Sequence, residues 1–82
     1  MKIKVLGPGC AKCHALDKTT REAVKDMGID AEVEYVTDMK KIMQYPILLT
    51  PALVIDEKLV MSGRVPSKAE VTTFITTAMA KK

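Results

Sequence analysis

The chain is poor in aromatic residues, with no tryptophan, one phenylalanine and two tyrosines among its 82 residues. Proteins that bind nucleic acid need aromatic stacking platforms or a basic stripe. Here the net charge of +3 is modest and is spread along the chain, with lysine pairs as the densest basic clusters. No apolar run approaches the roughly 20 residues that span a bilayer. We therefore expect neither nucleic acid nor a membrane among its partners.

Lysines follow the initiating Met1 without a long apolar run behind them, so we expect no signal peptide and a cytoplasmic location. The composition, 48% hydrophobic and 28% charged, is that of a folded globular protein. A chain of this length is too short to divide into two domains. We expect a single domain over residues 1–82, acting as a monomer.

Cysteine is also scarce: the chain has two, Cys10 and Cys13. Two cysteines are too few for a disulfide scaffold. A bridge between positions three apart closes a very small loop, worth roughly 2 kcal/mol at best before strain is subtracted. The pair is therefore interpreted as placed for chemistry rather than for stability.

Hydrophobic periodicity predicts an alternating α/β fold in the order β-α-β-α-β-β-α. Residues 2–6 alternate charged and apolar positions, as in a strand, and 52–55 are continuously apolar, as in a strand buried on both faces. Ser67 and Glu70 form a capping box before an amphipathic segment. The predicted strands are 2–6, 29–36, 52–55 and 59–61. The predicted helices are 11–27, which Gly28 ends, a short helix capped by Thr37 or Asp38 that runs to about residue 44, and 67–79.

Two expectations concern packing. The aliphatic stems of Lys2 and Lys4 should run along the edge of the short second helix, which lets their charged ends reach water. Five methionines are expected to fill gaps in the core, namely Met27, Met39, Met43, Met61 and Met79.

The cysteine pair lies where a predicted strand ends and a predicted helix begins. The first turn of a helix offers unpaired N–H groups and the positive end of the helix dipole, and both stabilise a thiolate. Lys12 adds a positive charge between the cysteines, and no acidic residue lies between Leu6 and Leu16 to oppose it. In such a pair the first sulfur tends to be exposed and the second buried, so we expect Cys10 to attack and Cys13 to resolve. Gly7 and Gly9 should let another backbone approach closely.

Three segments together resemble the thioredoxin superfamily, and within it the small thioredoxin/glutaredoxin-like redox-active disulfide proteins of archaea and bacteria. The resemblance extends from about Ile3 to Met79. The segments are Gly7-Pro8-Gly9-Cys10-Ala11-Lys12-Cys13, Thr50-Pro51-Ala52-Leu53 and Ser62-Gly63-Arg64.

This resemblance implies a minimal thioredoxin fold, with a four-stranded mixed sheet and helices on both faces. It implies a cis peptide bond before Pro51, a substrate strand paired with the backbone of Thr50, and a groove lined by Gly63. Pro8, Gly9 and Ala11 would border the same groove. The implied activity is thiol–disulfide exchange, an electron-transport reaction with disulfide-containing protein substrates and a separate thioredoxin-reductase-type electron donor. No bound cofactor is expected.

The motif departs from the usual thioredoxin pattern. Gly9 stands where thioredoxins have tryptophan, and Ala11-Lys12 replaces Gly-Pro between the cysteines. Residues 2–6 contain no match for the acidic residue that thioredoxins bury beneath the motif, and the tyrosine of the glutaredoxin motif is absent.

Two other functions use the same cysteines. Small metal-chaperone domains hold a soft ion such as Cu(I) with one CxxC, in a β-α-β-β-α-β architecture that ends on a strand. Cys10 to His14 also spells C-x-x-C-H, the attachment signature of c-type haem, with His14 as the axial ligand. Outside that role, His14 is expected to be an exposed helix residue or a base near Cys13.

Overall fold

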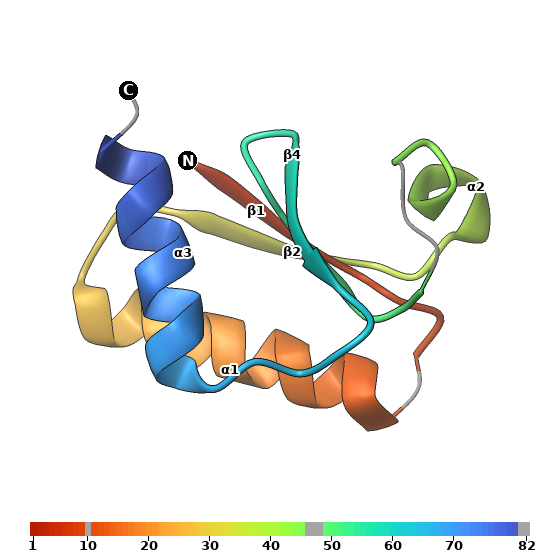
Figure 1. The fold of residues 1–82 in the computed structure, drawn as a ribbon, viewed down its shortest axis with the longest axis horizontal. Coiled ribbons are helices and arrows are strands. Elements are labelled where there is room, and N and C mark those ends of the chain that lie inside the picture. The colour runs from red at the N-terminus through yellow and green to blue at the C-terminus, as the bar shows by residue number, and fades with distance from the viewer. Residues whose placement is uncertain (10, 46–48, 81–82) are drawn as a thin grey trace.

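The computed structural model describes residues 1–9, 11–45 and 49–80. Its strands are β1 (Lys2–Leu6), β2 (Glu32–Val36), β3 (Ala52–Ile55) and β4 (Lys58–Ser62), and its helices are α1 (Ala11–Met27), α2 (Met39–Ile42) and α3 (Lys68–Ala80). The predicted order β-α-β-α-β-β-α and the α/β class are confirmed. Figure 1 shows α1 and α3 packed beside the sheet, whereas α2 lies apart from both helices, near one end of the sheet.

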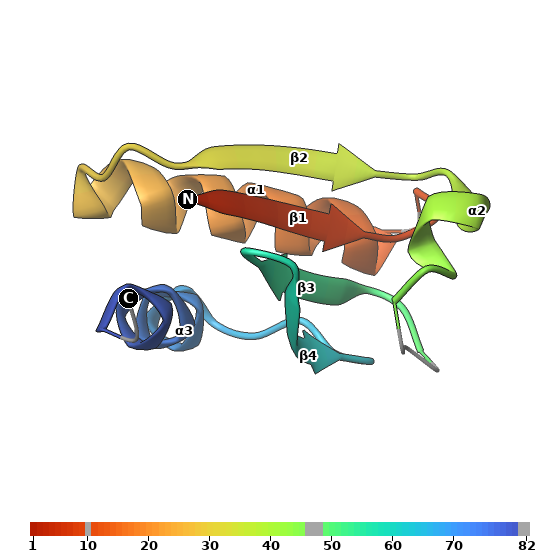
Figure 2. The same cartoon turned by 90° about the horizontal axis from the view of Figure 1, so that it is seen from above.

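The four strands form one mixed sheet in the order β2-β1-β3-β4. β1 pairs with β2 in parallel and with β3 antiparallel, and β3 and β4 form an antiparallel hairpin. Figure 2, in which the molecule is seen from above, shows β1 and β3 as the central strands. Because β1 leads directly into the cysteine motif, the motif is anchored to the middle of the sheet.

Alternate residues of the central strands supply two separate cores. Ile3 and Val5 of β1 pack with Leu53 of β3 against α1 and α3. Leu6 and Val54 point to the other face, where Ile42 of α2 covers them. All four residues of β3 are buried, as the continuous apolar run predicted. Both faces of the sheet are thus covered, which is the arrangement the family resemblance implied.

Two predicted elements are longer than the observed ones. β2 begins at Glu32 rather than at residue 29, because Lys2, the first residue of β1, lies opposite Glu32. α2 begins as predicted after Asp38, whose side chain accepts a hydrogen bond from the Lys40 N–H, but it ends at Ile42. The chain then tightens into a turn in which the Tyr45 N–H donates to the Ile42 carbonyl. This ending is expected for a residue that precedes proline in the sequence.

The β3–β4 hairpin is irregular in two respects. Asp56 and Glu57 at its turn both have left-handed backbone conformations, with φ of 48° and 68°. The register then shifts, because Leu53 lies opposite Met61 whereas Val54 lies opposite Leu59. One residue of β4, Val60, is therefore extra and forms a bulge.

The capping box of α3 forms only in part. The Ser67 hydroxyl accepts a hydrogen bond from the Glu70 N–H at 3.2 Å, as predicted. The Glu70 carboxylate is instead paired with Arg64, whose Nη2 lies 2.7 Å from it. A charged partner just before the helix thus competes successfully with the backbone of Ser67.

The expectation that five methionines fill the core is wrong for three of them. Met27 and Met61 pack against the larger core. Met39, Met43 and Met79 are 49%, 76% and 44% exposed. A helix of four residues presents a single position to the sheet, and in α2 that position is taken by Ile42. Met39 and the C-cap residue Met43 therefore face outward.

Candidate functional site

The cysteine motif follows the end of β1, a central strand of the sheet. Gly7, the first residue after β1, is buried, and its N–H donates to the carbonyl of Val36 at 3.0 Å. Pro8 and Gly9 are exposed, and Gly9 has φ of 98°, a conformation that favours glycine. The predicted nucleophile, Cys10, lies outside the described residues.

The helix that follows begins immediately after Cys10 and carries the second cysteine in its first turn. α1 starts at Ala11, and Ala11 and Lys12 are exposed. Cys13 is completely buried. The prediction that the second cysteine of the pair is the buried one is confirmed for Cys13.

The electrostatic surroundings of this first turn favour an anion. α1 has no acidic residue in its first turn. The first carboxylate along α1, Asp17, forms an ion pair of 3.0 Å with Arg21, one turn further along the helix. Within this turn, the N–H groups at the helix start and the exposed charge of Lys12 are thus not opposed by a carboxylate.

Pro51 lies at the same end of the sheet as the motif. In the antiparallel pairing of β1 with β3, Leu6 lies opposite Ala52, so the next residues outward are Gly7 and Pro51. The Thr50–Pro51 peptide bond is cis, and Pro51 is buried whereas Thr50 is partly exposed. The structure therefore brings the segment around Thr50 beside the motif, although the two are forty residues apart in the sequence.

Gly63 reaches this region through a backbone hydrogen bond. Its N–H donates to the carbonyl of Pro51 at 2.8 Å, and its φ of 85° requires a residue such as glycine. The open face of Gly63 is covered by Leu49, because a Cβ built on Gly63 would lie 3.0 Å from Leu49 Cδ1. Leu49 is itself 64% exposed. Leu49 is thus a further surface residue of the site, and the sequence signal that could have found it is an apolar residue directly before Thr50-Pro51.

Gly7 behaves differently from the expectation that it lets another backbone approach. It is buried, and the space beside its Cα is filled by the side chain of Cys13. This part of the expectation is wrong, because the close neighbour belongs to the same chain.

His14 projects from α1 toward the edge strand β2. It is exposed, and its ring meets the Tyr35 ring edge-on, with centroids 5.4 Å apart and an interplanar angle of 84°. This matches the interpretation of His14 as an exposed helix residue with an aromatic neighbour.

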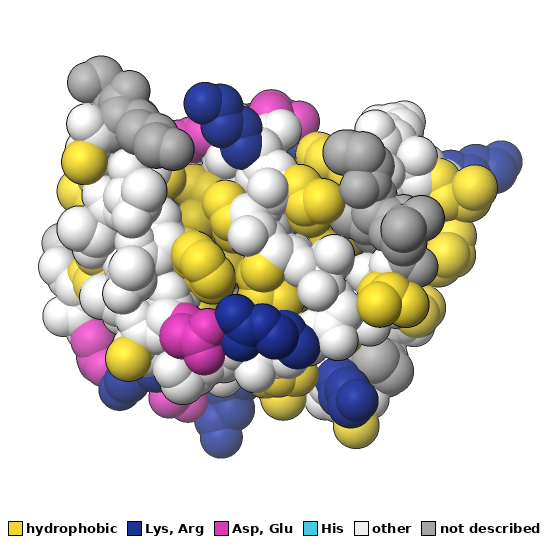
Figure 3. All heavy atoms as spheres, in the orientation of Figure 1, with side chains coloured by type: hydrophobic (Ala, Val, Ile, Leu, Met, Phe, Trp, Pro, Cys, Tyr) yellow, Lys and Arg dark blue, Asp and Glu magenta, His cyan; other side chains and the backbone are white. Residues whose placement is uncertain are grey.

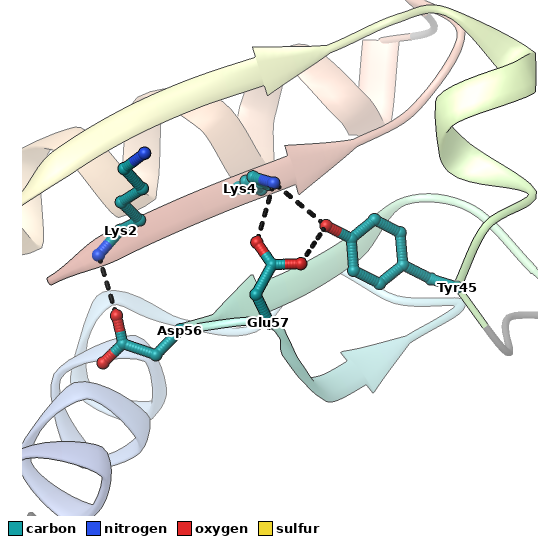
Figure 4. A network of polar contacts seen from close by, with 5 residues as sticks. All are labelled: Lys2, Lys4, Tyr45, Asp56 and Glu57. Carbon is teal, nitrogen blue, oxygen red and sulfur yellow. Dashed lines mark hydrogen bonds and ion pairs between the residues drawn. The ribbon is translucent and has the colours of Figure 1, made fainter.

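A polar network on the α2 face accounts for the lysine in the middle of β1. Lys4 Nζ donates to Glu57 at 2.9 Å and to the Tyr45 hydroxyl at 3.0 Å, and that hydroxyl donates to the other Glu57 oxygen at 3.0 Å. Figure 4 shows the three side chains meeting in a triangle, with Tyr45 coming from the turn after α2 and Glu57 from the β3–β4 turn. The Nζ of Lys4 thus lies at the turn that follows α2, whereas the prediction places the stems of Lys2 and Lys4 along α2 itself.

This network shifts the titration of both charged members. The hydrogen bonds from Lys4 and then Tyr45 lower the pKa of the Glu57 carboxyl below its ordinary value of 4.5. The hydrogen bonds to Glu57 and then Tyr45 raise the pKa of Lys4 well above its ordinary range. A central strand position that carries a cation is thus compensated by a carboxylate from the hairpin turn.

Glu57→Gln should lower the stability of the protein at neutral pH. It should also remove part of the loss of stability that the wild type shows in acid. The pKa of Glu57 is lower in the folded state than its ordinary value of 4.5. Its contribution to the free energy of unfolding is therefore fully present above about pH 4.5 and is lost as the pH falls through the folded-state pKa. We expect the difference in Tm between wild type and Glu57→Gln to shrink in acid and in high salt. Thermal melts across pH measure it. Glu32→Gln, at an exposed β2 position, is the control, and an equal effect of both variants at all pH values would contradict the network.

A separate apolar groove lies away from the motif. It has a volume of about 380 Å³ and is lined on its apolar side by Ile55, Val60, Phe74 and Ala78. Figure 3 shows apolar side chains in the hollow between α3 and the β3–β4 hairpin. This groove shares none of its lining residues with the site around Cys13 and Pro51.

Across residues 1–9, 11–45 and 49–80, no three or more His, Cys, Asp or Glu side chains are grouped so that they could hold a metal ion. In the same described ranges, no helix has the length and apolar character needed to cross a bilayer.

Comparison with known proteins agrees with this geometry. Residues 1–76 match the family described as Thioredoxin domain. A thioredoxin of Methanothermobacter thermautotrophicus is 46% identical over 71 residues, which cover 87% of this chain and 92% of the relative. A thioredoxin of Methanocaldococcus jannaschii is 36% identical over 69 residues, covering 84% of this chain and 79% of the relative. The chain therefore belongs to the thioredoxin superfamily, as one of its small redox proteins.

Proposed function

We propose that the protein exchanges electrons with protein disulfides through Cys10 and Cys13. The observation that carries the proposal is a completely buried Cys13 in the first turn of a helix whose first turn has no acidic residue. Membership of the thioredoxin family supports the kind of reaction, thiol–disulfide exchange. The assignment of the two cysteines to separate roles is our own inference.

In the proposed reaction the Cys10 thiolate attacks one sulfur of a substrate disulfide. A Cys10–substrate S–S bond forms, the substrate S–S bond breaks, and the departing sulfur takes a proton from water. Cys13, once deprotonated, then attacks the Cys10 sulfur. The Cys10–Cys13 disulfide forms, the Cys10–substrate S–S bond breaks, and the second substrate sulfur leaves as a thiolate that takes up a proton, so two electrons have passed from the dithiol to the substrate. The dithiol carries both electrons itself, and this route needs no bound cofactor.

The surroundings of the pair support separate tasks for other residues. Lys12 and the α1 start would stabilise the thiolate, since both place positive charge beside it. Pro8, Gly9 and Ala11 are exposed next to the cysteines and would border the substrate. Thr50, Pro51 and Gly63, joined by the Pro51–Gly63 hydrogen bond, would form the opposite wall, with Leu49 as its apolar surface.

We further propose the partners and setting of this reaction. The substrates are proteins with accessible disulfides, and a separate thioredoxin-reductase-type enzyme returns electrons to the chain. The protein acts as a monomer in the cytoplasm. A soft-metal chaperone with the same CxxC is the alternative function, but its β-α-β-β-α-β architecture differs from the observed order, in which α2 separates β2 from β3.

Alkylation and mass spectrometry test the proposed chemistry directly. Oxidised protein should be about two mass units lighter than reduced protein, because closing one disulfide removes two hydrogens. Reduction should expose two thiols to iodoacetamide, and Cys10 should react with an apparent pKa below the ordinary thiol value of about 8.5. Alkylation of a Cys10→Ser variant reports on Cys13 alone. A wild-type protein without a reversible mass change would refute the redox function.

A further inference from the structure

Gly7 differs from the other three glycines of the chain. Gly9, Gly28 and Gly63 have positive φ values of 98°, 64° and 85°, which explains the absence of a side chain at those positions. Gly7 does not have such a conformation. Its backbone continues from β1 and is held by the 3.0 Å hydrogen bond to Val36. The reason for a glycine at this position must therefore be space rather than backbone conformation.

The space beside Gly7 is occupied by Cys13. A Cβ built on Gly7 would overlap Cys13 Sγ and would lie 2.8 Å from Cys13 Cβ, a distance that real side chains do not adopt. Cys13 is completely buried, so the sulfur has little room to retreat. Gly7 is also buried and tied to β2, so it cannot swing away easily.

We propose that Gly7 is a positioning residue that seats the sulfur of Cys13 against the end of β1. Its catalytic meaning rests on the function proposed above, in which Cys13 attacks the Cys10 sulfur of a mixed disulfide. That attack needs the Cys13 sulfur in line with the bond that breaks. A displacement of about 1 Å can cost roughly 10²-fold in rate. A methyl group at position 7 would force such a displacement on the sulfur or on the first turn of α1.

The proposal has a directional consequence for the redox equilibrium. In the dithiol, the Cys13 sulfur has little room but is not bonded to Cys10, so a small shift of the side chain and of the first turn of α1 can relieve part of the overlap with an added methyl group. In the disulfide, the bond to Cys10 fixes the sulfur, so the overlap cannot be relieved in the same way. Gly7→Ala should therefore destabilise the oxidised form more than the reduced form. We expect at least a tenfold shift of the equilibrium with a reference dithiol toward the reduced protein, equivalent to about 30 mV.

The experiment compares Gly7→Ala with Gly28→Ala. Gly28 undergoes the same chemical change at a strained position, φ of 64°, but at the far end of α1 with open space around it. Two quantities are measured for each variant: the equilibrium with a reference dithiol, and the rate at which a mixed disulfide at Cys10 is resolved. Gly7→Ala should slow resolution at least tenfold and shift the equilibrium, whereas Gly28→Ala should lower stability and change neither.

A double-mutant cycle separates this proposal from the proposed function. The stability cost of Gly7→Ala is measured under reducing conditions in wild type and in Cys13→Ala, which lacks the overlapping sulfur. A smaller stability cost in the Cys13→Ala background supports the positioning role of Gly7, and so does a Gly7→Ala variant that folds only in that background. Equal costs in both backgrounds, or redox effects no larger than those of Gly28→Ala, overturn it. A wild-type protein with no reversible disulfide would instead refute the proposed function. The stability cycle would then still measure whether Gly7 makes room for the Cys13 sulfur.

Discussion

Cys13→Ser should accumulate a stable covalent complex with a disulfide-containing protein, and Cys10→Ser should form none. In the proposed reaction only Cys10 attacks the substrate, and only Cys13 releases it. Removal of the resolving sulfur replaces an intramolecular attack by attack from a thiol in solution. Because intramolecular positioning is worth many orders of magnitude in effective concentration, we expect release to slow by roughly 10²-fold or more.

Insulin serves as the test substrate, with each variant reduced, freed of reductant and mixed with it at neutral pH. Non-reducing gels and mass spectrometry of disulfide-linked peptides identify the trapped sulfur. The double variant Cys10→Ser/Cys13→Ser gives the background. Equal trapping by both single variants would overturn the assignment of roles, and trapping through Cys13 alone would reverse it. The burial of Cys13 is the structural reason to expect the first outcome.

Leu53→Ala should cost about 2–5 kcal/mol of unfolding free energy, the usual range when a buried leucine is truncated. Leu53 is fully buried in β3 and belongs to the core between the sheet, α1 and α3. For a chain of 82 residues the total stability is expected to be about 4–12 kcal/mol, so this one change can consume much of it. Urea titration monitored by circular dichroism measures the loss.

Leu49→Ala is the matched control, since the same atoms are removed four residues earlier from a side chain that is 64% exposed. We expect its stability to stay within about 0.5 kcal/mol of wild type. Similar losses for Leu49→Ala and Leu53→Ala would mean that the packing described for β3 is wrong. Because Leu49 borders the proposed groove, the same variant can also be assayed for weaker substrate binding.

Local patterns in the sequence predicted most of the fold. Alternation in 2–6, the continuous apolar run 52–55 and the helix stop at Gly28 depend on neighbours in the chain, and β1, β3 and α1 have the predicted bounds. The same local reasoning indicated a buried Cys13. In each case the physical cause, a period or a terminating residue, lies within a few positions of the element that it predicts.

Two predictions failed because of contacts between distant segments, and a third failed because of the length of a helix. Lys4 finds Tyr45 and Glu57, 41 and 53 positions away, and no periodicity encodes such a meeting. Gly7 admits Cys13 instead of another backbone because α1 folds back over the end of β1. Met39 and Met43 are exposed because α2 has a single turn, a property of the helix length and not of the residue types.

The bulge at Val60 also affects how the sheet terminates. β4 is an outer strand, and outer strands with regular, unsatisfied peptide groups invite neighbouring chains to add on and aggregate. A visiting strand that aligned with one half of β4 would fall out of step with the other half, since the extra residue interrupts the spacing of donors and acceptors. The bulge thus makes this edge of the sheet less suited to pairing with a strand of another chain.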